Sequence, residues 1–183
     1  MQPTPPQKGR FECPLPTLQA WTVPLAEGLG RELSRSATIG SGPINAVPPS
    51  AGTYILEMRL EKRVTIAVGQ LGRFTFARGW YLYVGSARGS GGLRGRIAHH
   101  LRDVRRPHWH IDYLRRAISI ERIFFSPTRR NNECFWTHRL ANLTSATYPV
   151  GRFGSSDCRC LSHLLYLGPR VAADQGFGDL IRS

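Results

Sequence analysis

Alternation of apolar and polar side chains predicts four short strands in the middle of the chain. The segments are GTYILEMRL, VTIAV, RFTFA and WYLYV, at 52–60, 64–68, 73–77 and 80–84. Such alternation indicates half-buried strands, with one face toward a core. Only the glycine-flanked turn 69–72 separates the second strand from the third, so these two are expected to form a hairpin. Because all the connections are short, we expect the four strands to form an antiparallel meander.

A glycine-rich corner separates the last of these strands from an amphipathic helix. The glycines of segment 85–92 are expected to break the strand, because glycine adopts backbone conformations closed to other residues. Apolar residues then recur at helical spacing and predict a helix over 93–104 that ends before Pro107. Arg96 and His100 lie four residues apart along one edge of its apolar sector. We therefore expect both at the rim of the core.

The second half of the chain mixes helical and strand patterns. Apolar spacing predicts a helix within 108–120, a buried strand at 121–126, a helix at 131–143 and a last strand at 163–167. Glu133 falls in the same sector of its helix as the apolar residues. A carboxylate directed toward a core is costly unless it is paired or bound to a metal. The sum predicts an α+β fold, a small antiparallel sheet with helices packed on it and an extra hairpin at 61–77.

The ends of the chain differ from this orderly middle. Residues 1–50 hold nine of the thirteen prolines, so we expect a disordered or low-complexity extension with a short helix around 25–33. An over-extended start codon would give the same composition. Residues 51–168 are expected to form one domain, followed by a loose tail at 169–183.

The charge balance points to a phosphate-rich partner. The net charge is +13, and Lys8 and Lys62 are the only lysines, so arginine carries the excess. Arginine forks onto phosphate oxygens, which favours DNA as the partner; RNA and a generally basic proteome are the alternatives. The arginines expected to contact DNA are Arg102, Arg105, Arg106, Arg115 and Arg116, with Arg129 and Arg130 nearby.

Cysteine content and hydropathy indicate a cytoplasmic protein. The four cysteines lack the dense spacing of a secreted disulfide scaffold, which indicates a reducing compartment. The chain has no apolar run long enough for a membrane span, and its first residues lack the apolar core of a signal peptide. We therefore expect no membrane partner, while the oligomeric state stays open.

Four short motifs follow one another in a specific order: GTY at 52–54, YVG at 83–85, Arg-x-x-x-His at 96–100, and a lone Glu at 133 that opens a later helix. This series resembles the GIY-YIG nuclease superfamily. The segments RGWYLYVGSARGSGGLRGRIAHHL, RRPHWHIDYL and GSSDCRCLSHL are similar to its stand-alone branch, catalogued as a domain of unknown function and sometimes linked to endonuclease III. The resemblance covers about 52–167. Thr53 stands where the superfamily usually has Ile, and the hairpin at 61–77 replaces a short link.

The resemblance implies a metal-dependent DNA endonuclease that acts in DNA repair or processing. It implies that Tyr54 and Tyr83 face the scissile phosphate, Arg96 binds it, and Glu133 ligates one Mg²⁺ or Mn²⁺ ion. His100 would support this network, and a repair glycosylase-type protein is an expected partner. The alternative is a module on the same fold that binds nucleic acid without cutting it.

The residue types suit this chemistry on their own. Phosphodiester hydrolysis needs a fixed cation at the phosphoryl oxygens, help for the leaving group and a base for water. Arg96 suits the first role, and Glu133 suits a hard cation that prefers oxygen ligands. Tyr54 is the candidate base, although its ordinary pKa near 10 requires help from the metal or from His100.

A second cluster is offered by His108, His110, Cys158, Cys160 and His163. Cys-x-Cys-x-x-His could supply zinc ligands, with one more from the His-x-His pair. The spacing is not a standard zinc-finger pattern, so the sequence favours a loop at the rim of the site, shaped by Ser156 and Asp157, over structural zinc. On this interpretation His108 and His110 anchor a helix start, and Asp112 orients a neighbour or accepts a hydrogen bond from an arginine.

Overall fold

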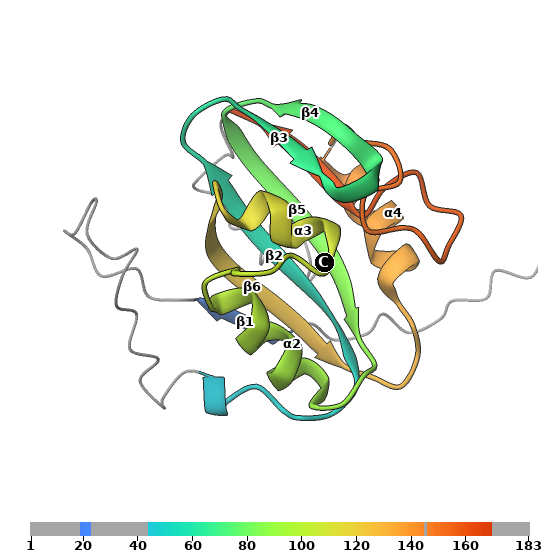
Figure 1. Cartoon of the computed structure of the whole chain (residues 1–183). Coiled ribbons are helices and arrows are strands. Elements are labelled where there is room, and N and C mark those ends of the chain that lie inside the picture. The colour runs from blue at the N-terminus through green and yellow to red at the C-terminus, as the bar shows by residue number, and fades with distance from the viewer. Residues whose placement is uncertain (1–18, 23–43, 145, 170–183) are drawn as a thin grey trace, which may run out of the picture.

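A single antiparallel sheet with helices on both faces forms the centre of the molecule (Figure 1). The computed structural model describes residues 19–22, 44–144 and 146–169. The strands are β1 (Gln19–Thr22), β2 (Gly52–Leu60), β3 (Val64–Val68), β4 (Gly72–Phe76), β5 (Gly79–Ala87), β6 (Ser119–Pro127) and β7 (Leu164–Gly168). The helices are η1 (Gly69–Leu71), α2 (Gly92–Leu101), α3 (His110–Arg115) and α4 (Glu133–Thr144). The predicted α+β class with an added hairpin is confirmed.

The strand order is β1-β6-β2-β5-β7, and every pairing is antiparallel. The predicted meander is wrong. β2 pairs directly with β5 along its whole length, while β3 and β4 form a separate two-stranded sheet. The hairpin leaves the main sheet because its inner side chains pack over it: Phe76 is fully buried, with its ring 6.3 Å from that of Tyr81. The hairpin thus covers one end of the sheet (Figure 1).

The predicted strand at 52–60 is confirmed as β2. The prediction that only one of its faces is buried is wrong, because the central strands are buried on both faces. Leu56 and Met58 belong to the core under α2, α3 and the hairpin, whereas Ile55 and Leu82 belong to the core under α4. Glu57 is fully buried, and Arg122 on β6 compensates its charge with hydrogen bonds to both carboxylate oxygens. Because Glu57 is charged, the alternating pattern predicted that its face of the strand is exposed to solvent. The sequence does not show that Arg122 pairs with it.

The glycine corner and the helix after it differ in detail from the prediction. β5 continues through Gly85 to Ala87. A side chain at Gly85 would collide with the Tyr54 hydroxyl, so this glycine permits a close approach instead of breaking the strand. Gly91 and Gly92 do have positive φ, and α2 starts there.

Helix α2 ends at Leu101 instead of residue 104. The Arg115 Nε donates to the His100 carbonyl oxygen at 2.8 Å, so a side chain satisfies the last turn and no further turn follows. The next residue, Arg102, is extended.

Some expectations fall on residues with little or no description. The helix around 25–33 lies outside the described residues, as does nearly all of the tail at 169–183. Within 1–50, residues 19–22 form β1 at the edge of the sheet, which composition did not predict. None of the described helices is long and apolar enough to span a membrane.

Candidate active site

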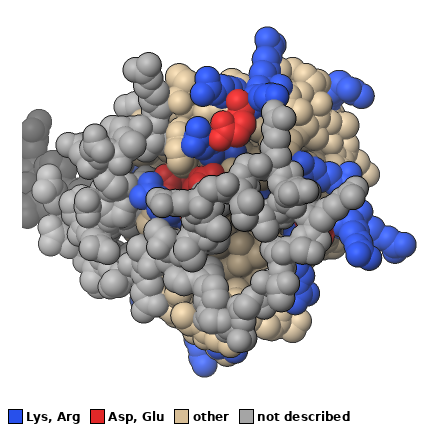
Figure 2. Space-filling view, turned by 90° about the vertical axis from the view of Figure 1, so that its left-hand side faces the viewer, with Lys and Arg blue, Asp and Glu red and all other residues tan. Residues whose placement is uncertain are grey.

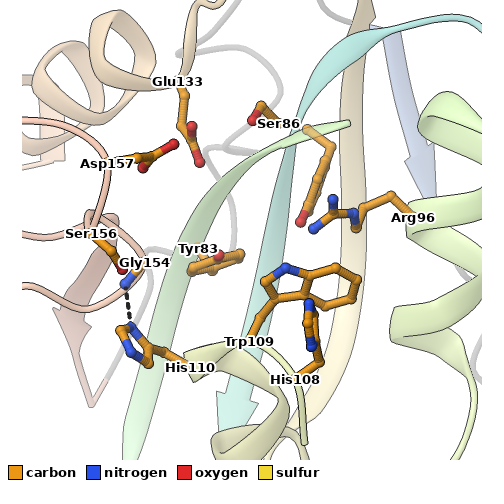
Figure 3. A pocket seen from close by; sticks show the side chains of 11 residues that line it. Tyr83, Ser86, Arg96, His108, Trp109, His110, Glu133, Gly154, Ser156 and Asp157 are labelled. Carbon is orange, nitrogen blue, oxygen red and sulfur yellow. Dashed lines mark hydrogen bonds between the residues drawn. The ribbon is translucent and has the colours of Figure 1, made fainter. Parts of the chain in front are cut away.

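Four of the five predicted catalytic residues line one polar pocket of about 290 Å³, and the fifth, His100, contacts Tyr54 from outside the lining. The pocket opens beside the end of β5, between α2, the loop before α3, the start of α4 and the loop before β7 (Figure 3). Its lining consists of Tyr54, Tyr83, Ser86, Arg96, His108, Trp109, His110, Glu133, Gly154, Ser156 and Asp157. Tyr54 and Glu133 lie far apart in the sequence, on β2 and at the start of α4, and the fold brings them together.

The two tyrosines stand side by side on β2 and β5. Their ring centroids are 6.4 Å apart, and both side chains are almost fully buried. The absence of side chains at Gly85 and Gly154 lets the rings fit, because a Cβ at either position would press into Tyr54 or Tyr83. The tyrosines are therefore held rigidly, with their hydroxyl ends toward the pocket.

His100 lies behind Tyr54 and is completely buried. Its Nε2 is 2.7 Å from the Tyr54 hydroxyl oxygen. Burial lowers the pKa of His100 to about 3; the nearby Asp112 opposes this shift, while His99, Arg96 and Arg115 add to it. His100 is thus neutral at ordinary pH and can accept a proton at Nε2.

Tyr54 itself holds its proton in this environment. Burial raises its pKa well above the ordinary value of 10, and Tyr83 raises it further, whereas the positive charge of Arg96 lowers it. The pKa of Tyr83 is raised as well, first by burial and then by Glu133. In the tautomer with the proton on His100 Nδ1, which lies 3.9 Å from Asp112 Oδ1, the Tyr54 hydroxyl donates to His100 Nε2. It can act as a base only if it passes its own proton on.

Arg96 is placed by an aromatic platform. Its Cζ lies 3.8 Å from the centroid of the Trp109 ring, a close cation–π contact. Trp109 is held by Asp112, whose carboxylate accepts hydrogen bonds from the backbone N–H groups of His108 and Trp109 at 2.9 and 3.0 Å. The same carboxylate lies 3.1 Å from His99 Nε2. The expectation that Asp112 orients neighbours is confirmed, although its partners are two backbone groups and a histidine instead of an arginine.

His99, His100 and Asp112 form a group whose side chains already contact one another and their neighbours. The three side chains are close enough to hold a metal ion. His100 Nε2, however, faces Tyr54, and Asp112 is engaged by the N–H groups of the α3 N-terminus. The pKa of Asp112 is accordingly lowered: burial raises it, but these hydrogen bonds outweigh burial. A hydrogen-bond network that supports Tyr54 and Trp109 accounts for the group.

Glu133 opens α4 and turns its carboxylate into the pocket (Figure 3). It is 7% exposed, and its Oε1 lies 3.1 Å from Nδ1 of the fully buried His163. Its burial is therefore compensated by a partner and does not by itself require a metal. Asp157 points into the same space from the loop before β7 (Figure 3). Two carboxylates facing one volume offer oxygen ligands to a hard divalent cation.

The Cys/His cluster forms a second group that could hold a metal ion. Cys158, Cys160 and His163 come together, and the fourth member is Cys134 in the first turn of α4. Neither His108 nor His110 belongs to this group, so the less favoured interpretation, in which one of them adds a zinc ligand, is wrong. The favoured interpretation, in which they mark a helix start, agrees with α3 beginning at His110. Both histidines line the active-site pocket, where His110 Nδ1 accepts a hydrogen bond from the Gly154 N–H at 3.0 Å. The loop before β7 was expected at the rim of the site, and it forms one wall of the pocket.

The predicted DNA-binding arginines divide into two kinds. Arg102, Arg105 and Arg106 are exposed on the connection from α2 to α3, and Arg116 is exposed at the end of α3. Arg115 is half-buried and donates to the carbonyl oxygens of His100 and Ile118, so it holds the fold together. Arg102 also lines a neighbouring cavity of about 440 Å³, which shares Arg96 and Trp109 with the main pocket.

Basic side chains are also spread widely over the surface. Figure 2 shows Lys and Arg in several separate groups around one face, with only small areas of Asp and Glu.

Three residues of the two groups were not predicted from the sequence. Trp109 lies between His108 and His110, for which the sequence offered a role in zinc binding, and no role was predicted for Trp109 itself. Ser86 follows the glycine of the second tyrosine motif. Cys134 directly follows Glu133, and its only signal was that Cys158 and Cys160 lacked a further ligand.

Fold and pocket together define a small α+β protein with one tyrosine-, arginine- and carboxylate-lined site. A family model described as "Domain of unknown function DUF123" matches residues 53–182, and the chain belongs to this family. No curated protein and no solved structure matches the chain.

Proposed function

We propose that the protein is a metal-dependent DNA endonuclease of the GIY-YIG type, which hydrolyses phosphodiester bonds in DNA repair or processing. The observation that carries the proposal is the convergence of Tyr54, Tyr83, Arg96 and Glu133 on one pocket. Short sequence motifs mark the same four residues. A chance resemblance of short motifs would not bring all four into a volume of about 290 Å³.

Arg96 would bind the scissile phosphate. It is the arginine that lines the pocket, and the Trp109 ring fixes its guanidinium there. A permanently charged fork near the phosphoryl oxygens stabilises the charge that develops in the transition state. Tyr83 would donate a hydrogen bond to the same phosphate, because its raised pKa keeps its proton in place.

Tyr54 and His100 would move the proton of the attacking water. Water transfers a proton to the Tyr54 hydroxyl oxygen as Tyr54 releases its own proton to His100 Nε2, 2.7 Å away. The charge thus ends on His100 and not on a tyrosinate. The low pKa of His100 keeps it neutral at the start and makes it a weak acceptor, so the nearby Asp112, which raises that pKa, would have to stabilise the imidazolium that forms.

Glu133, with Asp157 beside it, would hold one Mg²⁺ or Mn²⁺ ion. The two carboxylates supply the oxygen ligands that such ions prefer, and the pocket leaves room for waters that complete the coordination. When bound, the ion supplies positive charge for the leaving oxygen and the phosphate.

A cleavage assay tests the proposal. Wild type is incubated with supercoiled, branched and damaged DNA in the presence of Mg²⁺, Mn²⁺ or a chelator. We expect cleavage of at least one substrate that requires the divalent ion, and a loss of about 100-fold or more in Glu133→Gln. If the protein binds these DNAs but cuts none with either metal, the non-catalytic binding module is correct instead.

A further inference from the structure

A tetrad of soft ligands lies beside the active site and plays no part in the proposed hydrolysis. Cys134 comes from the first turn of α4, Cys158 and Cys160 from the loop before β7, and His163 from the residue before that strand. One ligand atom from each lies within 4.8 Å of all the others. The three thiols are free of disulfides, and Cys160 and His163 are buried.

The imidazole of His163 is oriented as a metal ligand would be. Its Nδ1 lies 3.1 Å from Glu133 Oε1, which favours the tautomer with the proton on Nδ1. Nε2 then presents its lone pair to the sulfur atoms, 3.3 Å from Cys158 Sγ and 3.9 Å from Cys134 Sγ. A carboxylate behind the far nitrogen is the usual companion of a histidine that binds zinc.

We propose that Cys134, Cys158, Cys160 and His163 bind one structural Zn²⁺ ion through three thiolates and Nε2. Three sulfurs and one imidazole are a common tetrahedral zinc set, in which neighbouring sulfurs lie about 3.8 Å apart. The separations in the cluster, from 3.3 Å between Nε2 and Cys158 Sγ up to at most 4.8 Å, lie on both sides of this geometry, so small shifts reach it. Softer thiolate ligands exclude Mg²⁺, so this ion is distinct from the one at Glu133.

The ion would link two walls of the active site. It joins the start of α4, which carries Glu133, to the loop that carries Gly154, Ser156 and Asp157. That loop has no regular secondary structure, and hydrogen bonds of its own hold it, such as Arg152 Nη1 to the Cys158 carbonyl oxygen at 2.9 Å and the His163 N–H to the Phe153 carbonyl oxygen at 2.8 Å. Zinc would fix the loop and, through His163, the position of the Glu133 carboxylate.

Metal analysis tests this site without any assay of cleavage, so its outcome is independent of the proposed nuclease. The full chain is purified without chelator, freed of any histidine tag, and its zinc content is measured by mass spectrometry. We expect about one Zn²⁺ per chain in wild type and a loss of at least tenfold in Cys158→Ser. The matched control is Cys13→Ser, which changes the cysteine outside the tetrad and should keep the full zinc content.

A second measurement covers the case in which the variant does not fold. Reduced, metal-free wild type is titrated with Co²⁺, which gives intense thiolate charge-transfer absorption when it replaces zinc. Saturation at one equivalent, with loss of the signal on addition of Zn²⁺, is expected. Wild type that holds less than a tenth of an equivalent of zinc and gives no thiolate absorption with Co²⁺ would overturn the proposal, as would full zinc content in a folded Cys158→Ser.

Discussion

At the scale of single residues, the central feature is a tyrosine and a histidine that depend on each other. The Tyr54 hydroxyl and His100 Nε2 are 2.7 Å apart in a buried setting. Burial keeps the first protonated and the second neutral. A relay through the pair replaces a buried tyrosinate by a buried imidazolium, which burial also disfavours and which Asp112 stabilises.

Removal of one hydroxyl tests this relay. Tyr54→Phe is expected to lower the cleavage rate about 100-fold or more, because general acid–base groups contribute on that scale. It should also destabilise the fold by about 1–2 kcal/mol, since His100 loses its partner. The control is Tyr81→Phe, because that buried hydroxyl donates to the Ala77 carbonyl oxygen at 2.6 Å, away from the pocket. Equal cleavage by both variants would remove Tyr54 from the mechanism.

The buried histidine makes stability depend on pH. The pKa of His100 is about 3 when folded, against an ordinary value of 6.5. As the pH falls from 6.5 toward 3, the unfolded chain takes up a proton that the folded chain excludes, so stability falls by about 1.4 kcal/mol per pH unit. Above pH 6.5 His100 is neutral in both the folded and the unfolded chain, so its titration costs no stability there.

Denaturant unfolding at pH 7 and pH 5 measures this effect. Wild type should lose about 2 kcal/mol more than His100→Gln over this interval. The exposed His108 serves as control, so His108→Gln should retain the wild-type loss. Identical losses in all three proteins would show that His100 titrates normally.

At the scale of elements, the connection between α2 and α3 positions Arg96, the residue proposed to bind phosphate. Asp112 holds this connection at the N-terminus of α3, and Trp109 on it stacks against Arg96. The helix that carries Arg96 therefore does not define the guanidinium position alone.

Loss of this platform should reduce activity more than stability. Trp109→Ala frees the Arg96 side chain, and a cation–π contact of about 0.5–2 kcal/mol corresponds to a loss of roughly 2- to 30-fold in cleavage. Trp80→Ala is the matched control, because Arg59 lies 5.7 Å from the Trp80 ring at a place remote from the pocket. Cleavage rates that fall equally in both variants would contradict a specific role for Trp109.

The elements also show what the sequence could and could not predict. Strand and helix positions follow from local periodicity, and most were predicted within a few residues. The pairing was not, because a short loop usually joins neighbours in one sheet. Here Phe76 and Val68 are buried, and the hairpin folds out of the sheet as a cover. The position of the hairpin depends on contacts with other elements, such as that of Phe76 with Tyr81, and a local sequence pattern does not show them.

In the candidate active site too, residues with a local motif were predicted and residues defined by distant contacts were not. Tyr54, Tyr83, Arg96 and Glu133 carry motif signals and were predicted. Trp109 and Cys134 have roles defined only by neighbours that are remote in sequence, and they were missed. The sequence disfavoured zinc at Cys158, Cys160 and His163 because their spacing is not a standard zinc-finger pattern, and Cys134 joins them only through the fold.

At the scale of the whole molecule, the charge distribution predicts how DNA binding responds to salt. Each phosphate contact that is lost should reduce the slope of log K against log salt by about 0.9. Joint replacement of the exposed Arg102, Arg105 and Arg106 by Ala should therefore lower the slope by about 2–3. The control replaces Arg63, Arg73 and Arg78, which are exposed near the hairpin and line neither cavity. A larger change in slope for the control would move the DNA path to the hairpin side.

The central claim is that the pocket around Arg96 cleaves phosphodiester bonds. Its most direct test is the single-turnover cleavage rate of Arg96→Ala on the best DNA substrate, with DNA affinity measured in the same samples. Arg73→Ala, an exposed arginine on β4, is the matched control. The account predicts a rate reduced about 100-fold or more at saturating DNA for Arg96→Ala and an unchanged rate for Arg73→Ala. Equal rates for wild type and Arg96→Ala at saturating DNA would contradict it.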